Sequence, residues 1–277
     1  MKSFLRRIAR ESVFATLDLF DTITGRRDPL TPPRRLMTVG SNSRFRNDFT
    51  AIGQQLFDML VEIGGLKPHH RVLDVGCGVG RLAIPLTRYL TTSYDGFDIV
   101  KPSIEYCQRV ITRKHPNFRF RLVQLHNTHY TPDVETKPYD FRFPYPDNSF
   151  DFVLLTSVFT HMQHRELQTY HAEIARVLAP GGICFATYFL LDQETDQQIA
   201  SGRTKLSFRF PMEHGRAEIA ENPDAAFAFD ADFVRASLAE CGLTVLREVR
   251  GNWRGEASAP GYQDILVFGR DAHAEPS

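Results

Sequence analysis

The sequence predicts an α/β fold with a doubly wound, mostly parallel sheet, preceded by a helical extension. From residue 71 onward, short apolar runs alternate with amphipathic segments, which is the pattern of strands connected by helices. A glycine-rich turn follows the first of these strands directly. The 277 residues, 42% of them hydrophobic, are enough for one large domain with a sizeable core.

The extension is expected to cover residues 1–64 and to act as a helical cap. Apolar residues at helical spacing predict a helix over 4–20, and three prolines within 26–35 predict an extended connector. A second helix is expected at about 47–63, ended by a glycine pair. We expect 36–60 to close over the open crevice of the sheet, because that crevice needs an apolar cover.

The first helix allows two interpretations. We favour a helix that packs on the body of the protein. The alternative is a basic amphipathic helix on an anionic membrane, because arginines are interleaved with its apolar residues. Acidic Glu11, Asp18 and Asp21 argue against membrane contact. The longest apolar runs of the chain are too short to span a bilayer.

The main domain is expected at 65–270, with a substrate lid inserted at about 191–229 and a disordered tail at 271–277. Strands are expected at 71–75, 94–98, 118–125, 150–156, 183–189, 244–249 and 264–270. Helices are expected at about 80–90, 102–114, 165–178 and 230–241.

Composition excludes several functional classes. Lysine plus arginine (33) equals aspartate plus glutamate (33), so no global basic field indicates nucleic-acid binding. The four cysteines are widely spaced and form no C-x-x-C pair, and no compact acidic cluster is visible, so we expect neither a zinc site nor another metal site. No secretory signal is visible, and we expect a cytoplasmic protein in a reducing environment.

The most specific pattern is VLDVGCGVGR at 72–81. A buried strand carries Asp74 near its end, glycines follow at alternate positions, and a helix begins. Glycines let a ligand lie against bare backbone, and the helix start offers free N–H groups. Arg81 stands where a dinucleotide fingerprint has its third glycine. The acid before the glycines indicates a ligand with an ammonium group instead of a pyrophosphate.

This stretch resembles the first motif of the class I methyltransferases that use S-adenosylmethionine. Three further segments resemble later motifs of that family in the right order: YDGFDIV (94–100), PYPDNSFDFVLLTSVFTHM (144–162) and ARVLAPGGICFATY (175–188). The resemblance covers about 65–190. It implies a Rossmann-like sheet of seven strands with an antiparallel last strand. It also implies S-adenosyl-L-methionine as cofactor and S-adenosyl-L-homocysteine as product.

The resemblance also assigns the cofactor site. In the family the glycine loop lies along the methionine part, the first strand-end acid holds the amino group and the second receives both ribose hydroxyls. No acid follows the third strand here, so we choose Asn127 for the adenine edge. The implied residues are Asp74, Gly76, Cys77, Gly78, Gly80, Arg81, Asp98, Ile99, Asn127, Thr156 and Ser157. The alternatives are a helix cap at Asp74 and turn residues at Asp98 and Asn127.

The methyl acceptor must approach the carboxyl edge of the sheet. His161 follows the fourth strand, where several small-molecule methyltransferases of the family carry a histidine, and histidine can accept a proton near neutral pH. We predict His161 as a general base, with a hydrogen-bonded structural role as the alternative. The other candidate substrate-binding residues are His164, Tyr188, Arg209, Trp253 and Arg254.

Trp253 is expected to be exposed on a loop and to face the acceptor, with a satellite hydrophobic cluster as the alternative. The arginines of the lid and of this loop suggest an acceptor with phosphate or carboxylate groups. No N/D-P-P-Y/F motif follows the fourth strand, which argues against methylation of DNA bases or protein glutamine. We therefore expect methyl transfer to a small molecule, sugar or lipid-linked acceptor at oxygen; the alternative is a non-catalytic cofactor-binding scaffold. Nothing in the sequence indicates the oligomeric state.

Overall fold

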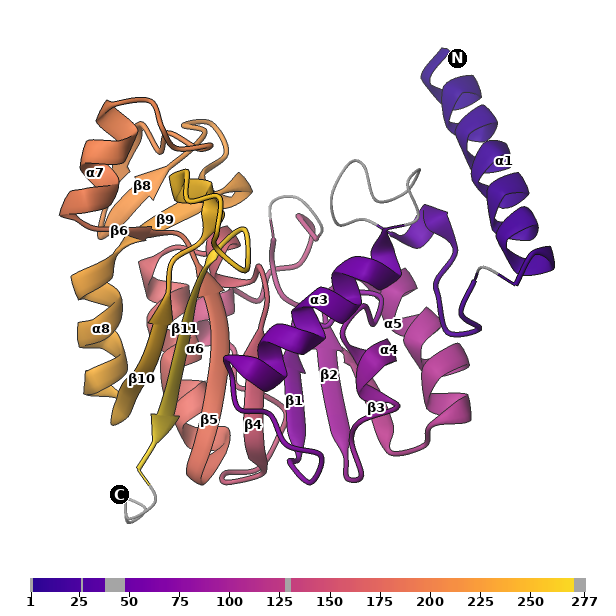
Figure 1. The fold of residues 1–277 in the computed structure, drawn as a ribbon, viewed down its shortest axis with the longest axis horizontal. Coiled ribbons are helices and arrows are strands. Elements are labelled where there is room, and N and C mark those ends of the chain that lie inside the picture. Colours follow the sequence, from indigo (N-terminus) through magenta and orange to yellow (C-terminus); the bar gives the residue numbers. More distant parts are fainter. Residues whose placement is uncertain (1, 26, 38–47, 128–130, 272–277) are drawn as a thin grey trace.

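The computed structural model describes residues 2–25, 27–37, 48–127 and 131–271, with side chains from residue 11 onward. Its centre is a seven-stranded sheet in the order β10-β11-β5-β4-β1-β2-β3 (Figure 1). β11 is antiparallel to both of its neighbours, and the other strand pairs are parallel. The predicted Rossmann-like fold, with its antiparallel last strand and an N-terminal helix, is confirmed.

The elements follow the predicted alternation. The strands of the main sheet are β1 (Val72–Val75), β2 (Tyr94–Asp98), β3 (Phe118–Leu122), β4 (Phe150–Leu155), β5 (Leu178–Tyr188), β10 (Leu243–Val249) and β11 (Asp264–Arg270). The helices are α1 (Lys2–Ile23), α3 (Phe49–Glu62), α4 (Ala83–Leu86), α5 (Lys101–Cys107), α6 (His164–Val177), α7 (Gln193–Ala200) and α8 (Ala231–Glu240).

The sheet is buried on both faces, because successive side chains of a strand point to opposite sides. Leu73 and Val75 of β1 pack in one core with α6 and α8. Val72, the alternate residue, packs in the other core with α3, α4 and α5. Ligands of such sheets bind beyond the carboxyl ends of the strands, and this arrangement leaves that edge for the site.

The segment after β5 forms a small second sheet in the order β6-β9-β8-β7. Its strands are β6 (Leu190–Leu191), β7 (Phe210–Met212), β8 (Gly215–Ala217) and β9 (Phe227–Asp230). Together with α7 it stands above the carboxyl end of β5 (Figure 1). The lid predicted at 191–229 thus contains strands and a helix that the sequence did not predict.

Three predicted elements differ in extent or in helix type. The helix expected at 80–90 is reduced to α4, because Pro85 has no N–H to donate and the Arg81 carbonyl lies against α3, where a Cβ on Gly53 would be 2.7 Å from it. β5 begins at Leu178, five residues earlier than predicted, and its register with β4 shifts between Phe150 and Phe152. The helix expected at 102–114 changes at Gln108 to a π-helical turn that ends at Thr112.

The N-terminal helix is attached through one face only. Phe14 is buried, and the connector after the helix packs in the α3 core through Leu30 and Met37. α1 itself stands apart from the sheet, on the side of β3 (Figure 1). Among the described residues no helix is long and apolar enough to cross a membrane. Of the cap expected at 36–60, residues 38–47 lie outside the described residues, as does the tail from residue 272 onward.

Candidate functional site

A cavity of about 660 Å³ opens at the carboxyl ends of β1, β2 and β4. Its size is typical of small-molecule pockets. All but one of the predicted cofactor-binding residues line it: Asp74, Gly76, Cys77, Gly78, Arg81, Asp98, Ile99, Asn127, Thr156 and Ser157. The predicted base, His161, lines it as well. The structure therefore brings together residues from four separate strand ends.

Asp74 is a buried carboxylate, and one of its two oxygens has no hydrogen-bond partner. The Tyr94 hydroxyl donates to its Oδ2 at 2.6 Å, whereas Oδ1 is buried and has no hydrogen-bond partner. Burial raises the pKa of Asp74 to about 7, against the opposing effect of the Tyr94 hydrogen bond. A buried hydrogen-bond acceptor without a partner lowers the stability of the folded state. An ammonium group in the cavity would satisfy Oδ1 and stabilise the charged carboxylate.

The glycines of the loop have two different roles. One leaves space for a ligand, and the other allows close packing within the fold. Gly78 has a φ of +54° and open space where a side chain would be, so it leaves the cavity free for a ligand. Gly80 does not line the cavity. A Cβ there would lie 2.6 Å from Ile111 Cδ1 and 3.2 Å from Cys107 Sγ, so this glycine lets α5 and the following turn pack closely. Its predicted contact with the cofactor has no support in the structure.

Asp98, at the end of β2, holds the loop from the neighbouring strand. Its Oδ2 accepts from the Gly78 N–H and its Oδ1 from the Val100 N–H, each at 2.8 Å. Each carboxylate oxygen can accept a second hydrogen bond, so hydroxyl groups of a ligand can share them. Asn127 lines the cavity, and its backbone also forms a bridge with Thr131. The binding and structural interpretations of Asn127 are therefore compatible.

Ser157, which follows β4, has a φ of +59°, an uncommon conformation for a residue with a side chain. Its N–H donates to Thr187 Oγ1 at 2.8 Å, and its hydroxyl donates to Gln263 Oε1 at 3.0 Å. The Thr187 hydroxyl donates to the same Gln263 oxygen at 2.7 Å. These hydrogen bonds to β5 and to the residue before β11 hold the strained Ser157 turn in place at the cavity wall.

His161 lies at the end of a short 3-10 helix, η4 (Phe159–His161), with its side chain exposed in the cavity wall. Its Nδ1 lies 2.8 Å from the backbone oxygen of Asp224. A carbonyl can only accept, so Nδ1 carries the proton, and Nε2 of the neutral ring keeps its lone pair. The ring is thus held in the tautomer that a general base needs.

Several residues that line or support the cavity were not predicted. Tyr94 acts through Asp74, and Asp224 comes from η5 (Pro223–Ala225) in the lid. Gln163, at the start of α6, connects this part of the cavity wall to the lid, since its amide donates to Asp224 Oδ1 at 3.2 Å. Further lining residues outside the prediction are Lys137, Tyr139, Met162, Glu166 and Tyr170. Phe49, which also lines the cavity, belongs to the cap predicted at 36–60. A capping pattern at the start of α6, with glutamate three residues after Gln163, was the one signal that could have marked this wall.

The five predicted substrate-binding residues lie outside this cavity. Tyr188 is fully buried, stacked on Phe159 at 4.7 Å between ring centroids and hydrogen-bonded to His171 Nε2 at 3.1 Å. His164 lies beside Glu213, and Arg209 is exposed. The expected exposure of Trp253 is wrong: its exposed fraction is 0%, in a satellite cluster with Phe189 and Phe208.

Trp253 and Arg254 instead belong to a clasp centred on Asp264, which is fully buried at the start of β11. Oδ1 of Asp264 accepts from Gly251 N and Arg254 Nε, both at 2.8 Å. Its Oδ2 accepts from Leu190 N and Trp253 Nε1, both at 2.9 Å. Arg254 also pairs with Asp192 at 2.9 Å. The clasp joins the lid to the main sheet.

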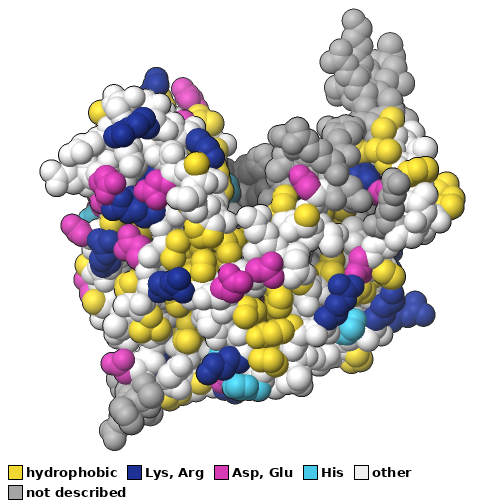
Figure 2. Space-filling view, in the orientation of Figure 1, with side chains coloured by type: hydrophobic (Ala, Val, Ile, Leu, Met, Phe, Trp, Pro, Cys, Tyr) yellow, Lys and Arg dark blue, Asp and Glu magenta, His cyan; other side chains and the backbone are white. Residues whose placement is uncertain are grey.

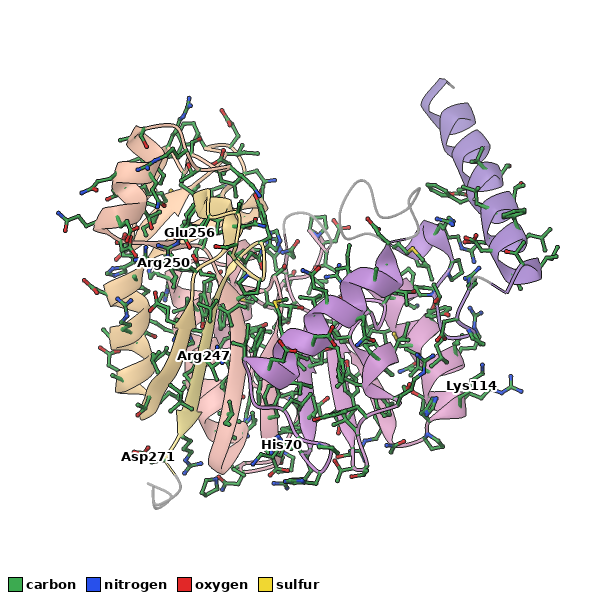
Figure 3. The ribbon with its side chains drawn as sticks, in the orientation of Figure 1. His70, Lys114, Arg247, Arg250, Glu256 and Asp271 are labelled. Carbon is green, nitrogen blue, oxygen red and sulfur yellow. The ribbon has the colours of Figure 1, made fainter. Side chains whose placement is uncertain are left out.

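The outer side of the clasp is also ionic. Arg250 pairs with Glu194 of α7 and lies 3.8 Å from Glu256. Figure 3 shows Arg250 and Glu256 beside the lid, on the side away from β1 and β2. The cations that were expected to attract an anionic acceptor are thus used in internal ion pairs or lie away from the cavity. The cations that line the cavity are Arg81 and Lys137.

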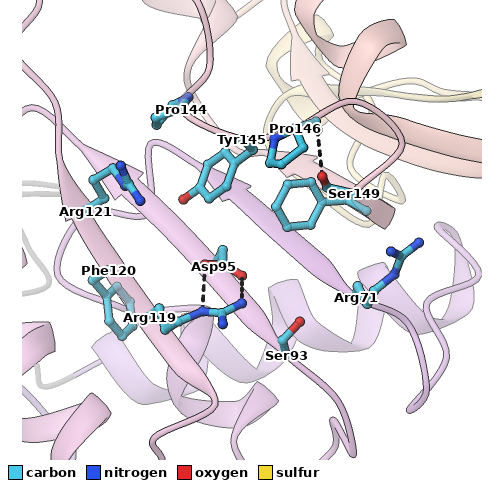
Figure 4. Close-up of a pocket in the computed structure, with 11 residues that line it drawn as sticks. Arg71, Ser93, Asp95, Arg119, Phe120, Arg121, Pro144, Tyr145, Pro146 and Ser149 are labelled. Atoms are coloured by element: carbon cyan, nitrogen blue, oxygen red, sulfur yellow. Dashed lines mark hydrogen bonds and ion pairs between the residues drawn. The ribbon is translucent and has the colours of Figure 1, made fainter.

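A second cavity, of about 460 Å³, lies at the opposite edge of the sheet, by residues that precede β1, β2 and β4 (Figure 4). Two of its three arginines are already paired, and the third, Arg121, lies over the Tyr145 ring. Arg119 makes two hydrogen bonds to Asp95, at 2.6 and 3.0 Å, and Arg71 binds Asp151 in the same two-pronged way. With two of its arginines paired and the glycine loop at the other edge, this cavity is the weaker candidate for a site. No group of three or more potential metal-binding side chains occurs among the described residues.

Comparisons with known proteins agree with this geometry. Residues 73–186 match the family described as "Methyltransferase domain". Two similar proteins are the sterol 24-C-methyltransferase of Schizosaccharomyces pombe (26% identical over 164 residues) and the methyltransferase GfsG of Streptomyces halstedii (28% over 130 residues). The matches cover 59% and 47% of this chain but only 39% and 41% of those proteins.

Solved structures share the fold at low identity. The magnesium protoporphyrin IX methyltransferase of Synechocystis PCC 6803, with bound SAH, has a TM-score of 0.53 and 19% identity. That comparison covers 86% of this chain and 92% of the other. A SAM-dependent methyltransferase from Methanosarcina mazei also has a TM-score of 0.53, at 18% identity, over 76% of this chain and 97% of the other.

Proposed function

We infer that this chain, which belongs to the class I S-adenosylmethionine-dependent methyltransferases, transfers a methyl group to a small-molecule, sugar or lipid-linked acceptor at oxygen. The cofactor supplies an electrophilic methyl group on a sulfonium. The observation that carries the proposal is Asp74, which lines the cavity and whose buried Oδ1 has no hydrogen-bond partner. This oxygen fits the ammonium group of the cofactor.

The other cofactor contacts follow from the same edge of the sheet. Asp98 would receive the ribose hydroxyls, and the bare backbone at Gly78 would lie along the methionine part. Asn127 offers an amide to the adenine edge. These residues come from β1, β2 and the turn after β3, so one extended ligand could contact all of them.

His161 would remove the proton of an acceptor hydroxyl through its free Nε2. Its Nδ1 bond to the Asp224 carbonyl supports this role, because it fixes the ring orientation and the tautomer. Transfer to carbon is the second candidate, and the name of the S. pombe relative, a sterol 24-C-methyltransferase, favours it. A cofactor-binding scaffold without transfer activity is the remaining alternative.

Two measurements test the proposal in sequence. Calorimetry should detect binding of S-adenosylmethionine and none of NAD, and no binding of the former would overturn it. Release of S-adenosylhomocysteine is then followed with acceptors identified by mass spectrometry of the material that co-purifies with the protein. The methylated position of the product separates oxygen from carbon. Cofactor binding without release of product, across those acceptors, would support the scaffold.

A further inference from the structure

The outward face of α1 is apolar and largely exposed. Val13, Leu19, Phe20 and Ile23 have exposed fractions of 49%, 60%, 53% and 75%, whereas Phe14, on the other side of the helix, is 2% exposed. Within the described part of α1, these four are spaced so that they share one side of the helix. Figure 2 shows apolar side chains on this part of the helix, separate from the apolar patches of the sheet.

The polar groups of this helix are turned inward or satisfied internally. Asp18 accepts from the Arg34 N–H at 3.1 Å and lies 3.4 Å from Arg27, and Asp21 pairs with Arg34. The Thr16 hydroxyl, on the outward side, donates to the Ser12 carbonyl at 3.0 Å. Asp18 and Asp21, two of the three acids that argued against membrane contact, therefore face the protein, whereas Glu11 is exposed. The outward face is free of charge between residues 12 and 23.

Charge selects among the partners that could cover this face. The first ten residues contain Lys2, Arg6, Arg7 and Arg10 and no acidic residue. A second copy of the helix would bring the same basic segment and would have no unpaired Asp18 or Asp21 to offer it. An anionic lipid surface provides both the apolar layer and the opposite charge.

We propose that α1 binds the interface of an anionic membrane, with Val13, Leu19, Phe20 and Ile23 inserted among the lipid chains. The helix lies in the plane of the interface, because its other face is attached to the protein through Phe14, Asp18 and Asp21. The basic segment contacts the headgroups. This proposal is independent of the transferase reaction.

Flotation of the full chain with vesicles tests the proposal through a matched pair of variants. The vesicles contain phosphatidylcholine alone or phosphatidylcholine mixed with phosphatidylglycerol. Leu19 and Leu246 are equally exposed, at 60% and 59%, but Leu246 lies on β10, far from α1. Leu19→Glu should weaken partition onto the anionic vesicles roughly tenfold or more, because an inserted leucine is lost. Leu246→Glu should bind like the wild type.

The dependence of vesicle binding on salt concentration is the second part of the test. Wild-type binding should require phosphatidylglycerol and should fall as salt screens the basic segment. Circular dichroism confirms that both variants are folded. The proposal is overturned if the wild type fails to bind anionic vesicles, if Leu19→Glu binds as well as Leu246→Glu, or if ultracentrifugation shows a dimer that Leu19→Glu dissociates.

Discussion

The two sides of the cavity are built differently. The proposed cofactor side is made by short stretches at the ends of neighbouring strands: the Gly78 N–H donates to Asp98, and the Tyr94 hydroxyl of β2 donates to Asp74 of β1. The acceptor side is assembled from His161 and Gln163 after β4 and Asp224 of the lid, held together across about sixty residues of chain. The first side depends on a local motif, and the second depends on the lid being in place.

The comparison is tested most strongly at His161. His161→Ala should lower kcat by roughly 10²- to 10⁴-fold, because a positioned base is lost, and should leave the affinity for S-adenosylmethionine nearly intact. His164→Ala is the matched control, since His164 lies outside the cavity, and it should retain the wild-type rate. A His161 variant that keeps more than about a tenth of the rate would make this residue structural or positioning.

The cofactor side is tested at Asp98. Asp98→Ala should weaken cofactor binding by about 1.5–3 kcal/mol for each hydrogen bond lost, measured by calorimetry. Asp95→Ala, on the same strand, removes a carboxylate that pairs with Arg119 at the opposite edge of the sheet, and it should not change the affinity. Equal affinities of the two variants would show that the ribose assignment is wrong.

A smaller effect is expected from pH. Because burial raises the pKa of Asp74 to about 7, this carboxyl becomes protonated as the pH falls through 7 and no longer pairs with an ammonium group. S-adenosylmethionine affinity should drop about tenfold between pH 8 and pH 6. Tyr94→Phe removes a bond that lowers this pKa, so its transition should move to higher pH. Asp74→Asn should bind weakly at both pH values, and a flat wild-type profile would contradict the assignment.

The sequence predicted the sheet well, because seven apolar runs, with helices in four of the six intervals between them, admit few topologies. It did not predict the second sheet of the lid, whose strands are only two to four residues long. It missed the short α4, because the contact between Gly53 and the Arg81 carbonyl connects distant segments.

The candidate site shows the same contrast between residues that a local motif locates and residues that only the folded chain brings together. The two motifs at 72–81 and 94–100 located Asp74, Gly78 and Asp98, because the strands that carry these motifs are neighbours in the sheet. Tyr188 was assigned to the wrong side of the sheet. Its strand neighbour Thr187 contacts the Ser157 turn, and alternation along the strand directs Tyr188 into the core with Phe159. Asp224 had no signal at all, since only the folded lid brings it to His161.

The clasp at Asp264 sets an order of assembly during translation. Its four donors belong to Leu190, Gly251, Trp253 and Arg254, but the acceptor is in the last strand of the sheet. Until β11 leaves the ribosome and pairs with β5, the lid has no buried carboxylate to bind, and Arg254 lacks its main counter-charge. The glycine loop and its strands are synthesised long before. The lid can therefore be joined to the sheet through this clasp only after β11 has been synthesised and has paired with β5.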